Sequence, residues 1–232
     1  AISRPKDTAK IWKSSNGVTG ATSMIKLQGK LPRQVWLACS GGVDSMAALD
    51  FLNRKHDVHV IHFDHKTKHS ALARKFVKEQ CAKYNVPLMI GEPDAANVDW
   101  PNPRKSQEET WRDWRYAFFD KFFTVPVITC HHLDDCVETW VMSSMHGTGK
   151  WVPYCRKHVI RPFRLTRKRD LEMWARLNGV DWIEDDSNTD TSYTRNYIRH
   201  EMMPHVLQVN PGIHKTVAKK VKADEYCTRE LV

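Results

Sequence analysis

Two short clusters in this chain have the residue types and spacing needed for chemistry on phosphate groups. The first, Ser-Gly-Gly-Val-Asp-Ser at residues 40–45, directly follows an apolar run at residues 35–39 that predicts a buried strand. The paired glycines Gly41 and Gly42 let the backbone turn sharply and approach a ligand closely. The apolar residues at 46–53 predict a helix whose first N–H groups face the same pocket. We therefore expect phosphate to bind here, with an ordinary Gly-Gly turn as the alternative.

Polar side chains of the same loop add to this prediction. Ser40 and Ser45 supply hydroxyl donors for phosphate oxygens. Asp44 is acidic where an anion is expected, which makes sense if its carboxylate holds a Mg²⁺ ion that bridges to the phosphate. The spacing differs from that of a Walker loop, and a second glycine cluster at residues 147–150 does not supply that spacing either. We interpret the second cluster as a turn.

The second chemical cluster, at residues 131–138, holds three carboxylates and two imidazoles. If a helix begins after His132, Asp135 and Glu138 are three residues apart and share a face that can point at a metal ion. Magnesium needs only one or two acids in addition to ATP phosphates, whereas zinc is disfavoured because no cysteine has ligand spacing. In the ordinary alternative, which we favour for these two residues but not for the whole cluster, Asp134 caps the helix and His132 is a structural hydrogen-bonding group.

A third polar group ends the predicted strand at residues 58–63. It consists of His62, Phe63, Asp64 and His65. Backbone groups at this position could recognise adenine, and a solvated strand end is an equally good interpretation for His62 and Phe63.

Two pairs of arginines lie on predicted helical faces. Arg112 and Arg115 are three residues apart, which suits a clamp for phosphate or carboxylate. Arg195 and Arg199 are four apart and could hold ATP phosphates or a tRNA backbone, although spacing alone favours a capped surface helix with solvated charges. The aromatic residues around the first pair are interpreted as packing residues: Trp111, Trp114 and Phe118.

Strand-like and helix-like segments alternate through the first two thirds of the chain. Strands are predicted over residues 35–39, 58–63, 88–90 and 127–130. Helices are predicted over residues 46–53, 71–84 and 109–122. This rhythm predicts an α/β fold with a twisted parallel sheet and helices on both faces, so that the three polar groups meet at the carboxyl ends of the strands.

The remaining segments show a different pattern. Residues 1–24 are predicted to be a loosely ordered leader, and the proline-containing residues 91–106 a surface loop. From residue 151 strand-like and helix-like segments no longer alternate. A strand is predicted near residues 158–161, and helices near 168–177 and 193–203. We interpret residues 151–232 as a small helical appendage, a lid or substrate-reading part of the same unit, in which the lysines of residues 215–222 are a solvated end rather than a phosphate-tracking helix.

Composition narrows the classes of function. Lysine and arginine exceed the acids by 36 − 27 = 9, and nine tryptophans are unusual at this length, so we expect a nucleic-acid partner in preference to simple solubility charge. The six cysteines form no Cys-x-x-Cys pair, which argues against a structural zinc site or an iron–sulfur cluster and predicts reduced thiols. No apolar run approaches a membrane span and no secretory signal is evident, so a cytoplasmic protein without a membrane partner is expected.

Taken in order, these motifs resemble the catalytic domain of the tRNA(Ile)-lysidine synthetase family, N-type ATP pyrophosphatases of the PP-loop superfamily. The resemblance runs from about residue 35 to about residue 211. It rests on the loop at 40–45, His62–His65, Arg112–Tyr116, the cluster at 131–139, Arg161-Pro162, and the Trp-x-Glu-Asp-x-Ser-Asn…Arg-Asn-x-x-Arg signature at residues 182–199. That last signature separates the family from thiolating relatives, which generally use paired cysteines that are absent here.

The resemblance implies a fold, a reaction and partners. The fold is Rossmann-like, of the adenine nucleotide alpha hydrolase type, with a PP-loop ATP pyrophosphatase domain at residues 25–150 and a family-specific segment of the same catalytic unit at 151–232. The cofactors are ATP and Mg²⁺, and the partners are free L-lysine and an isoleucine tRNA with a CAU anticodon, with a homo-oligomer left open. The wobble cytidine (C34) is adenylated at its C2 oxygen, and lysine then displaces AMP.

The resemblance also implies roles for individual residues. Residues expected to bind ATP are Ser40, Gly41, Gly42, Asp44, Ser45, His62 and Phe63. Residues expected to hold magnesium are Asp44 and Asp135. Residues expected to act in catalysis are Asp44, His131, Asp135, Arg195 and Arg199. Residues expected to meet lysine or tRNA are Asp64, Arg112, Arg115, Glu138 and Asn196.

The chain departs from the family pattern at several positions without losing a core catalytic group. Trp111 stands where a small residue is usual, and Arg164 where an apolar residue is usual. Two other classes of function remain as alternatives: a thiolating or amidating tRNA adenylase with the same loop, and a nucleic-acid-binding relative without catalysis.

Overall fold

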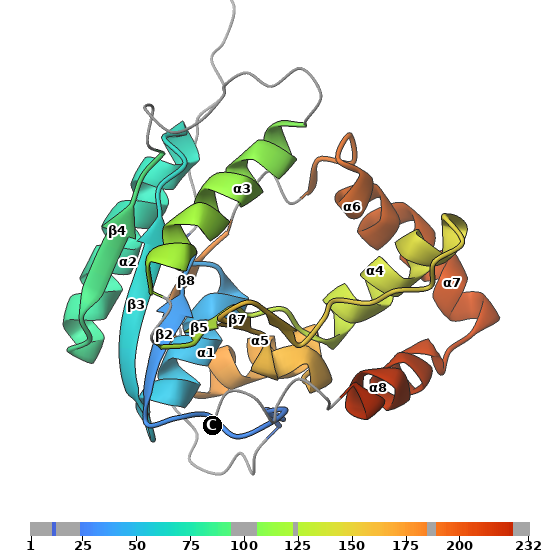
Figure 1. The fold of residues 1–232 in the computed structure, drawn as a ribbon, viewed down its shortest axis with the longest axis horizontal. Helices are drawn as coiled ribbons and strands as arrows, with labels where there is room; N and C mark the ends of the chain where they lie inside the picture. The colour runs from blue at the N-terminus through green and yellow to red at the C-terminus, as the bar shows by residue number, and fades with distance from the viewer. Residues whose placement is uncertain (1–10, 13–23, 94–105, 123–124, 185–188, 225–232) are drawn as a thin grey trace, which may run out of the picture.

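The structure is a computed structural model, and it describes residues 11–12, 24–93, 106–122, 125–184 and 189–224 (Figure 1). Most of the predicted leader and of the 91–106 loop lie outside the described residues. Within the leader, strand β1 (Ile11–Trp12) pairs antiparallel with β8 (Trp182–Ile183), which the sequence did not predict.

Six short strands form one sheet. In the sheet their order is β4-β3-β2-β5-β7-β6. Their bounds are β2 Gln34–Ala38, β3 Asp57–Phe63, β4 Leu88–Gly91, β5 Val127–Ile128, β6 Cys155–Arg156 and β7 Val159–Ile160. The pairs from β4 through β7 are parallel, with Leu37 beside both Val60 and Ile128, and only β6 is antiparallel. The predicted α/β class and parallel sheet are confirmed, whereas the β6 hairpin was not predicted.

Helices cover both faces of this sheet, as predicted. One face carries α1 (Val43–Asn53), α2 (Lys68–Tyr84) and α5 (Lys168–Leu177), which share one apolar core with the strands. The other face carries α3 (Gln107–Phe119). The steps β2–β3 and β3–β4 run in one direction, and the step from β4 to β5 runs back across the sheet. Right-handed crossovers therefore place α3 opposite α1 and α2.

A second group of helices lies to the right of the sheet in Figure 1 and has its own apolar core. It contains α4 (Leu133–Met145), α6 (Thr194–Tyr197), the π-helical turn Ile198–Met202, α7 (Met203–Val209) and α8 (Ile213–Ala223). The single helix predicted near residues 193–203 is therefore wrong in its bounds. Pro204 lies in the first turn of α7 and has no N–H to donate, so a regular α-helical hydrogen-bond ladder cannot pass through this point.

Helix α8 is amphipathic. Ile213, Val217 and Val221 are buried against α4 at spacings of four residues, while the lysines face outward. Gln28 donates a hydrogen bond from Nε2 to the Val221 carbonyl at 3.0 Å, which ties the C-terminal half of this helix to the start of the described core.

Arg164 is buried completely, which is unusual for a charged side chain. Its guanidinium donates to Gln28 Oε1 at 2.9 Å, to the Val152 carbonyl at 2.7 Å and to Asp224 Oδ2 at 2.9 Å. A buried charge is tolerated only when it is paired and hydrogen-bonded, and this one joins three segments that are distant in sequence.

The remaining structural predictions concern cysteines and membranes. The five described cysteines are free thiols; Cys39, Cys81 and Cys136 are buried and the other two are half-buried. Among the described residues, no helix combines the length and the apolar character that crossing a bilayer requires.

Candidate active site

The loop at residues 40–45 leaves the carboxyl end of β2 and leads straight into α1. Gly41 has φ of +90°, a conformation that side chains disfavour, and Gly42 is the residue before the first turn of α1. Ser45 Oγ accepts a hydrogen bond from the Gly41 N–H at 3.2 Å and donates one to the Gly42 carbonyl at 2.9 Å. Ser45 therefore holds the loop in shape, and the helix N-terminus faces the end of the sheet where phosphate was predicted.

Asp44 lies in the first turn of α1 and has an unusual environment. Its Oδ1 is buried without a hydrogen-bond partner, and its Oδ2 lies 3.7 Å from His132 Nε2. Burial is the main cause that raises the pKa of Asp44, and the nearby charge of Asp135 raises it further. A buried carboxylate oxygen without a donor fits a cation, so Asp44 has the chemistry expected of a Mg²⁺ ligand.

His132, and not Asp134, caps the N-terminus of α4. Its Nδ1 accepts from the Asp135 N–H at 3.2 Å, while Asp135 Oδ2 accepts from the His132 N–H at 2.9 Å. The ring proton is therefore on Nε2, which faces Asp44. The prediction of Asp134 as the cap is wrong because that carboxylate accepts from the Lys168 N–H at 2.8 Å and lies 3.0 Å from His214 Nε2. The structural role foreseen for His132 is confirmed.

The acids of α4 meet the arginines of the segment after residue 193. Arg199 donates to both oxygens of Glu138 at 2.8 Å and to Asp135 Oδ1 at 3.3 Å. Arg195 donates to Thr139 Oγ1 at 3.2 Å. Burial opposes ionisation of Asp135, but the nearby histidines and Arg195 outweigh it and lower its pKa to about 2. Asp135 and Glu138 were predicted to share a helical face, and so were Arg195 and Arg199; both predictions are confirmed.

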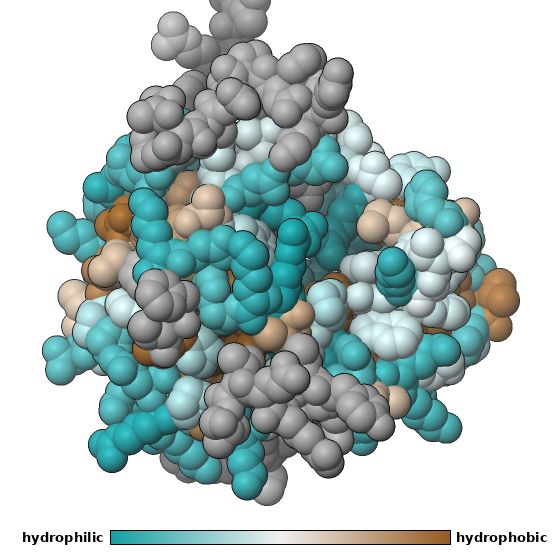
Figure 2. All heavy atoms as spheres, viewed as in Figure 1, coloured by the Kyte–Doolittle hydropathy of each residue, from teal (hydrophilic) through white to brown (hydrophobic). Residues whose placement is uncertain are grey.

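A pocket opens beside this cluster, between α3 and the start of α6 (Figure 2). It is lined by His65, Trp111, Arg112, Arg115, Tyr116, His131 and Arg195. Burial is the main cause that lowers the pKa of His131 to about 3 and that of His65 to about 4, so both rings are neutral at pH 7. The positive charge of the pocket therefore comes from its arginines, and the surrounding face is largely hydrophilic in Figure 2.

Two aromatic residues of α3, both predicted to be packing residues, have different surroundings. Trp111 is half-buried and lines the pocket, with its ring 5.4 Å from that of His65, so it has more than the packing role predicted for it. Phe118 packs near Gly91 and lies 5.8 Å from the ring of Phe63, as a packing residue should.

Other predicted site residues make structural contacts. Asp64 accepts from Ser70 Oγ at 2.6 Å, from the Lys66 N–H at 2.8 Å and from Arg74 at 3.3 Å, so its carboxylate is tied to the start of α2. His62 Nδ1 donates to the Cys39 carbonyl at 2.9 Å. Asn196 donates to the Asp190 carbonyl at 2.9 Å. Part of the signature at residues 182–199, namely 185–188, lies outside the described residues.

Sequence reasoning assigned no role to Arg161 or to Tyr116. Arg161 is 1% exposed, and its Nη2 donates to the Tyr116 hydroxyl at 2.8 Å beneath the pocket. In the sequence, the only signal for Arg161 was its place in the Arg161-Pro162 motif. A second pocket, also not predicted, combines acids, bases and an apolar wall. It is lined by Asp134, Glu138, Arg167, Lys168, Arg199, Met203, Leu207 and His214.

Comparison with known proteins shows the family to which the chain belongs. The model of the PP-loop domain matches residues 18–206. The chain belongs to the PP-loop domain family. The loop at residues 40–45 is called the PP-loop below. The structure of the U34-tRNA thiolase NcsA from Methanococcus maripaludis has a similar fold, with a TM-score of 0.63 at 14% identity over 88% of this chain and 74% of that one.

Curated relatives are named tRNA(Ile)-lysidine synthase. The chain is 33% identical to the one from Thermotoga sp. (strain RQ2) over 201 residues, which cover 81% of this chain and 48% of the relative. It is 34% identical to the one from Geobacter sulfurreducens over 204 residues, which cover 80% and 43%. The chain therefore spans about half the length of the curated relatives it matches.

Proposed function

We propose that this chain ligates lysine to C2 of the wobble cytidine of a CAU-anticodon isoleucine tRNA, using ATP and releasing AMP and pyrophosphate. The observation that carries the proposal is the unpartnered Oδ1 of Asp44, which lies at the PP-loop. Its other oxygen lies 3.7 Å from His132, the cap of α4, whose Asp135 is held by Arg199. Similarity to the tRNA(Ile)-lysidine synthases supports the choice among PP-loop reactions. Because free lysine, tRNA and ATP all occur in the cytoplasm, we place the reaction there.

The PP-loop binds the nucleotide in this proposal. The backbone of Gly41 and Gly42, the hydroxyl of Ser40 and the N-terminus of α1 hold the departing pyrophosphate. Asp44 and Asp135 are the residues that would hold Mg²⁺, which neutralises charge on the phosphates when it is bound. Among the described residues, no group of three or more histidines, cysteines or acids is placed to hold a metal ion, so phosphates and water must complete the coordination.

The first chemical step is adenylation. The C2 carbonyl oxygen of cytidine forms a bond to the α-phosphorus, and the bond from that phosphorus to the bridging oxygen breaks, which releases pyrophosphate. Arg115 and Arg195 of the pocket balance the charge that develops at the phosphorus. His131, whose ring is neutral, orients groups by hydrogen bonding, since Thr129 Oγ1 lies 2.9 Å from its Nδ1.

The second step joins lysine to the activated base. The amino group forms a bond to C2, the bond from C2 to oxygen breaks, and AMP leaves. The amine must first lose a proton to a base. Two acids, Asp64 and Glu138, are expected to meet lysine or tRNA, and both are already held by donors in the protein. Only Glu138 lines one of the two pockets described above, the second one. That pocket, with acids, bases and the apolar Met203 and Leu207, suits a zwitterion with an aliphatic chain, so we assign lysine to it.

The experiment that tests the proposal measures the products of ATP. We expect AMP and pyrophosphate to form only when both lysine and an isoleucine tRNA with a CAU anticodon are present. Replacement of lysine by sulfide or ammonia separates the branches of the family, because a thiolating or amidating enzyme would use one of these in its place. RNA binding without any AMP would favour the non-catalytic relative and contradict the proposal.

A further inference from the structure

Tyr116, in the last turn of α3, is approached by three guanidinium groups. Its hydroxyl accepts a hydrogen bond from the buried Arg161. Its ring centroid lies 5.6 Å from Cζ of Arg112, on the same helix, and 5.4 Å from Cζ of Arg156, on the edge strand β6. Cations are attracted to the faces of aromatic rings, and here two of them from different elements share one ring.

The charges of Arg112 and Arg156 are not balanced by the protein. Both side chains are exposed, and among the described residues neither has a carboxylate within ion-pair distance. Asp120, an acid of the same region, lies 2.7 Å from Lys157 Nζ and is paired with it. Two guanidiniums that share one ring and have no acid are complementary to an anion, and their planar donor forks match the oxygens of a phosphate group.

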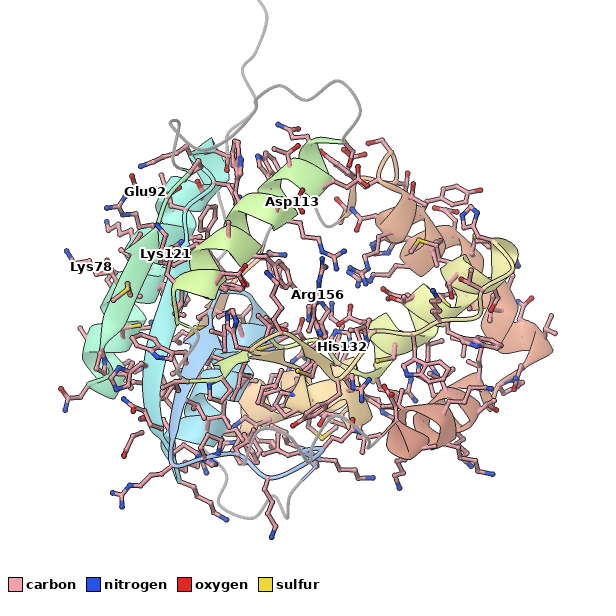
Figure 3. All side chains as sticks on the ribbon, viewed as in Figure 1. Lys78, Glu92, Asp113, Lys121, His132 and Arg156 are labelled. Carbon is pink, nitrogen blue, oxygen red and sulfur yellow. The ribbon has the colours of Figure 1, made fainter. Side chains whose placement is uncertain are left out.

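The position of this pair indicates which phosphate it fits. Arg112 and Tyr116 line the pocket that His131 and Arg195 also line. Figure 3 places Arg156 between α3 and α4, and β5 and β7 separate its strand β6 from β2 and the PP-loop. Because the PP-loop is the place for the phosphates of ATP, a phosphate at the rim of the pocket belongs to a different molecule.

We propose that Arg112 and Arg156, stacked on Tyr116, bind a backbone phosphate of the RNA strand next to the nucleotide that enters the pocket. This inference rests on the proposed function, since it takes the RNA to be the substrate of the same site. Phosphate contacts fix the position of a nucleic acid without reading its sequence. Arg156 is therefore a positioning residue, which holds the RNA strand in place and does not touch the reacting atoms.

The test uses Arg156→Gln and a stem-loop RNA with a CAU anticodon loop, whose affinity is measured by fluorescence anisotropy over a series of salt concentrations. We expect weaker binding and a slope of log affinity against log salt that is smaller by about 0.7, the value for one phosphate contact to a single strand. ATP binding stays as in the wild type. The matched control is Arg33→Gln, which removes the same charge at a different place. Arg33 is exposed, directly precedes β2 and forms an ion pair with Asp57. We expect this substitution to leave RNA binding unchanged.

Two outcomes would overturn the inference. One is an affinity and salt slope for Arg156→Gln equal to those of the Arg33→Gln control. The other is a loss of ATP binding with RNA binding intact, which would assign the phosphate to the nucleotide. Wild-type protein that binds the RNA through Arg156 but transfers no lysine would contradict the proposed function and leave this inference standing, so the two failures are distinguishable.

Discussion

Arg199 and Glu138 form a two-pronged ion pair, in which Nε and Nη2 of the arginine each lie 2.8 Å from a carboxylate oxygen. The two residues are 61 positions apart in sequence. Arg199 also contacts Asp135, so one guanidinium fixes two acids of α4 relative to the π-helical turn. The pair thereby holds together the two segments that flank the candidate active site.

Substitutions of Arg199 should separate its structural role from its chemical role. Arg199→Ala leaves the carboxylate of Glu138, which is 7% exposed, without its partner, and we expect the free energy of unfolding to fall by about 3 kcal/mol. Arg199→Lys keeps the charge but cannot form the fork. We expect it to retain more of the stability in urea unfolding but to lose RNA-dependent AMP formation. Wild-type activity in Arg199→Lys would show that charge alone suffices.

Asp44→Asn should stabilise the protein without ligands and abolish its response to them. A raised carboxyl pKa means that the folded state holds the proton more tightly than the unfolded chain, so ionisation at neutral pH lowers stability. We expect the Tm of Asp44→Asn without Mg²⁺ and ATP to equal or exceed that of the wild type. The rise in Tm that Mg²⁺ and ATP give the wild type should disappear.

Asp50→Asn is the matched control on the same helix. Asp50 accepts from Arg54 and from Trp174 Nε1 at 2.8 and 2.9 Å, so its loss should lower Tm. The rise in Tm with Mg²⁺ and ATP should remain, because Asp50 makes these contacts away from the PP-loop. A normal response to Mg²⁺ and ATP in Asp44→Asn would contradict the assignment of Asp44.

Gly41→Ala should disrupt the PP-loop through crowding as well as backbone strain. A Cβ at this position would lie 3.1 Å from Ile183 Cδ1 and 3.3 Å from Phe76 Cδ1. Gly147 also has positive φ, +74°, but a Cβ there meets nothing within 4 Å. We expect Gly147→Ala to cost about 1 kcal/mol from strain alone, and Gly41→Ala to cost more and to lose ATP binding. Equal effects on stability and ATP binding would show that the contacts with Ile183 and Phe76 are unimportant.

Asp134→Asn should change how stability depends on pH. Burial opposes ionisation of Asp134, but hydrogen bonds from His214 and the Lys168 N–H outweigh it and lower its pKa. A lowered carboxyl pKa gives stability that is fully present above the ordinary pKa of 3.8 and is lost as pH falls below it. In urea unfolding, the wild type should therefore exceed Asp134→Asn clearly at pH 7, by an amount that shrinks below about pH 4. A constant difference down to pH 3 would contradict this account.

Local pattern was sufficient to predict the parallel sheet and the PP-loop. Residues 35–45 combine an apolar run, two glycines and a following helix, and each of these signals acts over a few neighbouring residues. The same holds for Asp135 and Glu138, whose shared face follows from helical spacing. Contacts across the fold had no such signal. The bond from Arg161 to the Tyr116 hydroxyl joins residues 45 positions apart, and only the folded chain brings them together.

Two local features were also missed, for different physical reasons. His132 caps α4 with a ring nitrogen, although Asp, Asn, Ser and Thr are the usual capping residues. Strands of two residues, such as β1 and β6, are too short to show a periodic pattern. Asp64 illustrates a third limit, because its motif gave no sign that its carboxylate accepts hydrogen bonds from Ser70, Lys66 and Arg74.

The measurement that tests the central claim most directly is the transfer of radiolabelled lysine to RNA. The protein is incubated with labelled lysine, ATP, Mg²⁺ and an unmodified isoleucine tRNA with a CAU anticodon, beside a methionine tRNA as control. Label in the isoleucine tRNA alone, lost in Asp44→Asn, is the predicted result. Absence of label from both RNAs, while ATP still binds, would contradict lysine ligation and assign the site to another nucleophile or another RNA.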